Sequence, residues 1–143
     1  MIRYFDTSAL VPYYRPEPLS AACEALLLNS AEGVLVSDLT GVEFASVLAR
    51  LVRTGELFDD DARRVHAAFS QDLSNGAFLP AKLSAGDSQR ARDWLLLRTT
   101  GLRTLDALHL ACAAGAKAEL VTADGLMAKA ASILAVPCHF VMG

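Results

Sequence analysis

The sequence lacks the residues from which cross-linked proteins and thiolate metal sites are built. Its 143 residues include three cysteines at scattered positions, Cys23, Cys112 and Cys138. They are too few and too irregular for a disulfide framework or a zinc motif. Apolar runs are also short, because the longest charge-free segments, 107–116 and 130–143, fall below the roughly eighteen residues that a membrane span needs. We therefore expect reduced, buried thiols and no membrane segment.

Several sequence motifs are missing as well. Arg3 and Asp6 interrupt the first apolar residues before a secretory signal can form, which favours a soluble cytoplasmic protein. There is no G-x-x-x-x-G-K-[ST] or G-x-G-x-x-G loop, which gives no support to nucleotide binding, and no G-x-S-x-G elbow of a serine hydrolase. Asp6 as a covalent phosphate acceptor is also disfavoured, since position 8, where such sites carry a second acid, is Ser8.

The composition is that of a globular protein with a sizeable core. The chain is 53% hydrophobic and 20% charged, and its length suits one domain, residues 1–143, and not two. The formal net charge is −3, and basic residues are mostly arginine. Contact with a nucleic acid would therefore need a local basic patch and not a bulk positive field.

Apolar stretches typical of strands alternate with stretches that have helical periodicity. Strands are predicted at 2–5, 33–37, 77–83, 118–124 and 138–142, and helices at 8–14, 18–30, 40–54, from 59 onward, 84–100, 103–116 and 125–134. Pro80 places the third strand at an edge. This alternation predicts an α/β fold with a mostly parallel central sheet and helices on both faces.

Two helices show apolar stripes that predict which side is buried. In the helix at 103–116 the stripe is Leu105, Leu108 and Cys112, with Asp106 at its rim. In the helix at 40–54 we expect an inward stripe opposite two outward arginines: Val42, Ala45, Leu48, Ala49 and Val52 inward, Arg50 and Arg53 outward.

Four carboxylates stand near predicted strand ends or helix starts: Asp6, Glu43, Asp106 and Asp124. Each alone has a structural explanation. Glu43 completes a Thr40-x-x-Glu43 capping box, Asp106 follows Thr104 as a candidate N-cap, Asp124 could itself cap the next helix, and Asp6 could end a turn.

Together the four carboxylates suggest a metal site. The carboxyl ends of parallel strands and the starts of the following helices meet at one edge of the sheet. Carboxylates crowded at that edge repel one another unless a cation holds them, and oxygen ligands suit Mg²⁺ or Mn²⁺. His109 lies three residues after Asp106 and could join the site, but a buried histidine hydrogen-bonded to a neighbour is the favoured interpretation. His66 and His139 are interpreted as structural.

Four segments resemble, in order and spacing, the signature blocks of PIN-domain nucleases, and in particular those of VapC-like toxins from type II toxin–antitoxin pairs. The segments are "YFDTSALV", "LTGVEFASVLARLVRTGEL", "LRTLDALHLACA" and "LVTADGLMAKAA". The resemblance covers essentially the whole chain. It implies a parallel sheet between helices, with Asp6, Glu43, Asp106 and Asp124 as acidic metal ligands and Ser8 and Thr122 as supporting polar residues.

The activity implied by the resemblance is hydrolysis of RNA phosphodiester bonds with Mg²⁺ or Mn²⁺. Arginines near the site are candidate contacts to RNA phosphates: Arg98, Arg103, Arg50 and Arg53. The partners implied are an RNA substrate, a small antitoxin whose helical segment fills a groove near the site, and a second copy of the chain in a homodimer. The alternative is a non-catalytic PIN-type scaffold that binds RNA or protein and keeps these carboxylates as helix caps.

Overall fold

The computed structural model describes residues 1–143 and contains one sheet of five parallel strands in the order β3-β2-β1-β4-β5. The strands are β1 (Arg3–Phe5), β2 (Val34–Ser37), β3 (Leu79–Ala81), β4 (Glu119–Thr122) and β5 (Cys138–Phe140). The central strand β1 pairs with β2 and β4, with Arg3 opposite both Val34 and Glu119. The α/β fold with a parallel sheet is therefore confirmed, and the sheet is entirely parallel.

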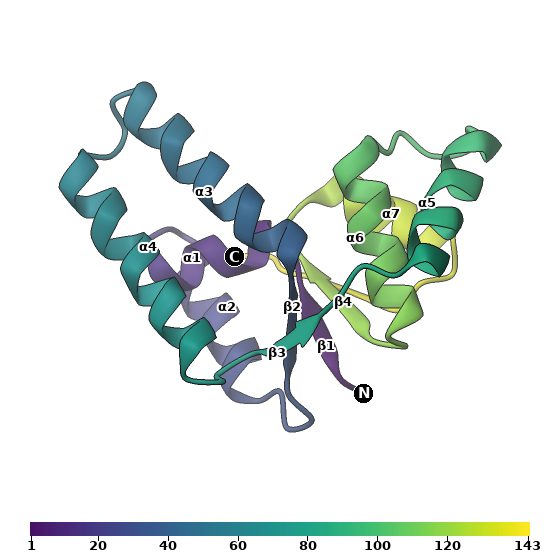
Figure 1. The fold of residues 1–143 in the computed structure, drawn as a ribbon, viewed down its shortest axis with the longest axis horizontal. Helices are drawn as coiled ribbons and strands as arrows, with labels where there is room; N and C mark the ends of the chain where they lie inside the picture. The colour runs from purple at the N-terminus through teal and green to yellow at the C-terminus, as the bar shows by residue number, and fades with distance from the viewer.

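Seven helices cover the two faces of the sheet: α1 (Thr7–Tyr14), α2 (Ser20–Leu28), α3 (Asp38–Arg53), α4 (Asp59–Ser74), α5 (Ala85–Leu97), α6 (Thr104–Gly115) and α7 (Gly125–Ile133). Figure 1 shows α1–α4 on one side of the strands and α5–α7 on the other. The first three strands of the chain thus fill one half of the sheet, from β1 to the edge strand β3. The last two strands, β4 and β5, lie on the other side of β1.

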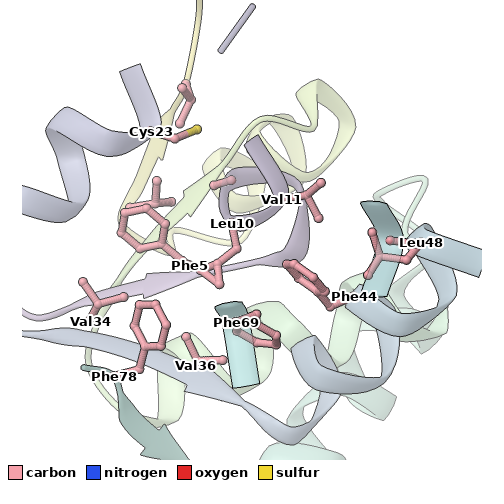
Figure 2. Close-up of a cluster of buried hydrophobic side chains, with 14 residues drawn as sticks. Phe5, Leu10, Val11, Cys23, Val34, Val36, Phe44, Leu48, Phe69 and Phe78 are labelled. Carbon is pink, nitrogen blue, oxygen red and sulfur yellow. The ribbon is translucent and has the colours of Figure 1, made fainter. Parts of the chain in front are cut away.

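The three inner strands β1, β2 and β4 are buried on both faces, and their successive side chains enter different cores. Phe5 and Val121 belong to the core under α1–α4, whereas Tyr4 and Leu120 belong to the core under α6 and α7. Figure 2 shows the first of these cores, in which Phe5, Leu10 and Phe44 are labelled. The short apolar strands in the sequence are explained by this double burial.

The inward face predicted for α3 is wrong in part, since Leu48 is buried as predicted but Val42, Ala45 and Ala49 are exposed. Val42 is 74% exposed, whereas the buried residues of the helix are Thr40, Phe44, Leu48 and Leu51. The helix carries two overlapping apolar stripes, and the one with the larger side chains packs on the sheet because it removes more apolar surface from water. The other stripe (Ala45, Ala49 and Val52) lines a cleft against α4.

The stripe predicted for α6 is also wrong in part. Leu105 is 43% exposed, and α6 buries a run that includes Ala107, Leu110 and Ala111. Small alanines let α6 approach both the sheet and α5 closely. Pro12 lies inside α1, which ends at Tyr14 as predicted. Other differences are shifts of helix and strand ends by a few residues.

All three cysteines are unpaired thiols, with Cys23 and Cys112 buried and Cys138 partly buried. Burial raises the pKa of each thiol to about 11. None of the seven helices combines the length and the apolar character that crossing a lipid bilayer would require.

The two sides of α3 should respond differently to truncation. Phe44 is fully buried and stacks on Phe69 with ring centroids 4.3 Å apart, so Phe44→Ala should lower the free energy of unfolding by about 3–5 kcal/mol. Val42→Ala on the exposed side should change it by less than about 0.5 kcal/mol. Urea denaturation of both variants measures the difference. Equal losses would show that the packed face of α3 is assigned wrongly.

Candidate functional site

The site begins with Asp6, which follows the central strand β1 directly and is 3% exposed. One carboxylate oxygen, Oδ1, accepts hydrogen bonds from the Ser8 hydroxyl at 2.6 Å and from the Ala9 amide at 3.2 Å. The other, Oδ2, accepts from the Thr122 hydroxyl at 2.6 Å. Asp6 therefore caps α1 and is tied to the end of β4 at the same time.

Burial raises the pKa of Asp6, because the charged carboxylate is taken out of water. The hydrogen bonds from Ser8 and Thr122 favour the ionised form and offset only part of this effect. Repulsion between carboxylates was expected at this edge. For Asp6 the largest cause of the shifted pKa is its own burial.

Asp124 follows β4, two residues after the strand's last residue, Thr122. Its amide donates to the Thr122 hydroxyl at 3.0 Å, which in turn donates to Asp6. Its carboxylate accepts from the amides of Leu126 at 2.9 Å and Met127 at 3.4 Å, so it is the N-cap of α7, as one of the sequence interpretations held. Asp6 and Asp124 both stand where the strand order changes direction, the usual location of ligand sites in open parallel sheets.

Glu43 reaches the same edge from α3. Its Oε1 accepts from the Thr7 hydroxyl at 2.9 Å and is hydrogen-bonded to Nε2 of His109. The predicted capping box with Thr40 is wrong, because α3 begins at Asp38 and Glu43 lies in its second turn. Glu43 is thus held by side chains from two other helices and has no role in its own helix start.

Burial would raise the pKa of Glu43, but the hydrogen bonds from His109 and Thr7 outweigh it and leave the pKa below its ordinary value. His109 is 1% exposed, and its Nδ1 lies 2.7 Å from the Tyr4 hydroxyl. The favoured interpretation of His109, a buried histidine bonded to a neighbour, agrees with these contacts.

Asp106 lies in the first turn of α6, one turn before His109. Its carboxylate accepts from the Arg103 amide at 3.3 Å. Arg103, and not Thr104, is the N-cap residue. Asp106 shares no hydrogen-bond partner with the other three carboxylates, and its spacing from His109 places these two residues on one face of α6.

A groove of about 460 Å³ opens at this edge of the sheet. Glu43 and Asp124 line it together with the hydroxyl residues Thr7 and Ser8. Arg50 lines the groove as well, and so does Arg15, which the sequence analysis did not single out. The other candidate RNA contacts lie at helix ends: Arg53 ends α3, Arg98 follows α5 and Arg103 precedes α6.

Sequence reasoning also missed Thr7 and the link from Tyr4 through His109 to Glu43. The only local signal was the hydroxyl pair in Asp6-Thr7-Ser8. The remaining contacts join residues far apart in the chain.

The structure does not gather all four carboxylates at one point. No three acidic, histidine or cysteine side chains lie close enough together to hold a metal ion in this conformation. The donor chemistry nonetheless fits a hard divalent cation, because carboxylates and hydroxyls, and no thiol, line the groove. Asp6, whose pKa is raised by burial, is a group that a nearby cation would keep ionised.

Solved structures with the same fold include three from bacteria. VapC20 of Mycobacterium tuberculosis, described as a toxin that cleaves the sarcin–ricin loop, is 18% identical (TM-score 0.68; 90% of this chain and 94% of that chain covered). VapBC2 of Rickettsia felis, bound to promoter DNA, is 17% identical (TM-score 0.70; 98% and 98%). FitAcB of Neisseria gonorrhoeae is 22% identical (TM-score 0.69; 96% and 96%).

A comparison with curated proteins found no match. The sequence itself matches the PIN domain family over residues 3–133, from the start of β1 to the end of α7. This match takes in β1, α3, α6 and β4, the elements that carry the four carboxylates. The chain therefore belongs to the PIN domain family.

Proposed function

We propose that the chain, as a single domain over residues 1–143, is a metal-dependent endoribonuclease toxin of a type II toxin–antitoxin pair. The observation that carries the proposal is the placement of Glu43. Its carboxylate is held by Thr7 and His109 at the carboxyl edge of the sheet and lines a groove with Asp124. Helix capping accounts for Asp6 and Asp124, but it does not account for Glu43.

The proposed roles follow from these contacts. Asp6, Glu43, Asp106 and Asp124 would hold Mg²⁺ or Mn²⁺, which when bound lowers the pKa of a water and neutralises charge on the scissile phosphate. Ser8 and Thr122 orient Asp6 by donating to its two oxygens. Thr7 orients Glu43.

We assign the binding of the substrate's phosphates to arginine side chains. Arg50 lines the groove beside Glu43, and none of Arg50, Arg53, Arg98 and Arg103 forms an ion pair within the chain. Guanidinium groups without a carboxylate partner are free to bind RNA phosphates. Arg50, which lines the groove, supports contact with RNA phosphates by a chain with a net charge of −3.

The proposed protein partner is a small antitoxin. The structural neighbour VapBC2 is described as bound to a DNA fragment from its promoter. In this chain an exposed cleft of about 560 Å³ separates α3 from α4 and is lined mainly by apolar side chains, among them Ala45, Ala49 and Val52. A cleft of small apolar residues supports binding of a helical segment. A homodimer in the cytoplasm completes the proposal.

The alternative, a non-catalytic PIN-type scaffold, is favoured by one observation. Asp6, Asp106 and Asp124 each accept a backbone amide at a helix start, as caps do. In that case the carboxylates would stabilise the fold whether or not a metal is present.

RNA cleavage should require a divalent cation. The purified protein is expected to cut RNA with Mg²⁺ or Mn²⁺ and to stop in excess chelator. Asp106→Asn should keep the fold and lower the rate by at least about 100-fold, because it removes a charge with little change of shape. Asp93→Asn on exposed α5 is the matched control and should cut at the wild-type rate. Cleavage by Asp106→Asn at that rate would favour the scaffold.

Thermal melts separate a metal ligand from a cap. Asp6→Asn removes a charge that burial disfavours, so in chelator this variant should melt higher than wild type and gain less from Mg²⁺. Asp124→Asn should barely change the metal-free melting temperature, since asparagine is also a good N-cap, but should likewise gain less from Mg²⁺. If both variants gain as much from Mg²⁺ as wild type does, neither residue is a ligand.

Expression of the chain alone should slow bacterial growth. Glu43→Gln should restore growth at equal protein level, because it removes the carboxylate without removing the side chain. Co-expression with a small protein encoded next to the gene should also restore growth and yield a complex on size-exclusion chromatography. Healthy growth with abundant wild-type protein would contradict the toxin role.

A further inference from the structure

Behind Glu43 lies a row of buried polar side chains joined by hydrogen bonds: Ser37, Tyr4 and His109. The Tyr4 hydroxyl is 2.7 Å from Oγ of Ser37 and 2.7 Å from Nδ1 of His109. Nε2 of His109 then contacts Oε1 of Glu43. Tyr4 and His109 are almost completely buried, and the row ends at the groove, where Glu43 is half-buried.

The hydrogen bonds of this row have one consistent direction when His109 is neutral. An ionised carboxylate can only accept, so Nε2 carries the hydrogen and donates to Glu43. Nδ1 must then accept, which makes Tyr4 the donor to His109 and Ser37 the donor to Tyr4. Tyr4 thereby selects the imidazole tautomer that presents a donor to Glu43.

The two oxygens of Glu43 are used differently. Oε1 accepts from both Thr7 and His109, which lie on different helices. Oε2 accepts no hydrogen bond from the protein, although the side chain lines the groove. One oxygen is therefore anchored, and the other is left for a ligand.

We infer that His109 is a positioning residue: with Tyr4 behind it, it fixes Glu43 through Oε1 so that Oε2 faces the groove as a cation ligand. The inference rests on the proposed function, since it assigns the arrangement to metal binding. His109 is 1% exposed, and burying an imidazole costs free energy that an apolar side chain would not, so packing alone does not explain the residue.

A matched pair of variants tests this role. In His109→Gln the longer amide can still reach Glu43 from the position of Nε2, whereas in His109→Asn the amide stops near the position of Nδ1. Affinity for Mn²⁺, measured by electron paramagnetic resonance on the full chain, should fall about 10–100-fold in His109→Asn. It should fall less than about threefold in His109→Gln. His139→Gln, on the exposed end of the sheet, is the control and should match wild type.

A double-mutant cycle distinguishes positioning from general damage to the fold. If His109 acts through Glu43, adding His109→Asn to Glu43→Gln should weaken Mn²⁺ binding by less than about twofold further. A purely structural role predicts that the two losses multiply. If His109→Asn does not fold, Tyr4→Phe replaces it in both measurements, with an expected loss of about threefold because only the hydroxyl behind His109 is removed.

The outcomes separate this inference from the proposed function. Suppose that the wild-type protein binds Mn²⁺ and cuts RNA, and that His109→Asn and His109→Gln bind Mn²⁺ equally well. This result overturns the positioning role alone. Wild-type protein that neither binds Mn²⁺ nor cuts RNA overturns both. Long-range ¹H–¹⁵N spectra of the metal-free protein should show hydrogen on Nε2 and not on Nδ1. The reverse assignment also overturns the positioning role.

Discussion

The burial of Asp6 at the end of the central strand is the constraint on which the site depends. Strand β1 is covered on both faces, so the residue that follows it leaves the sheet where water has little access. A carboxylate there needs donors from the protein. Ser8, Ala9 and Thr122 supply them. These donors fix the start of α1 against the end of β4, and the groove forms around that junction.

The hydrogen bond between Glu43 and His109 joins the two helical layers at this edge of the sheet. Glu43 belongs to the layer of α1–α4, whereas His109 belongs to the layer of α5–α7. Their hydrogen bond crosses the carboxyl ends of the strands, where the sheet itself no longer separates the layers. Each carboxylate thus has its own set of donors. The environments differ accordingly: burial raises the pKa of Asp6, while His109 and Thr7 lower that of Glu43.

The sequence predicted the order of elements and the parallel sheet because both follow from local patterns: short apolar strands alternate with helical stretches, and breaks mark their ends. It did not predict which face of α3 packs. Val42 and Phe44 lie on different stripes of similar apolar character, and only the sheet decides between them. At the site, local position in the chain indicated all four candidate carboxylates, Asp6, Glu43, Asp106 and Asp124. The contact of Glu43 with His109 spans 66 residues and leaves no local pattern.

The two edges of the sheet determine how this protein can associate. The edge strands β3 and β5 have three residues each, Pro80 lies in the middle of β3, and Pro137 directly precedes β5. A proline has no amide hydrogen to donate, and three residues offer few backbone groups to an added strand. Neither edge is therefore a template for strand-by-strand stacking of chains into fibrils. Assembly with itself or with another protein is left to the helical surfaces, where side chains can select the partner.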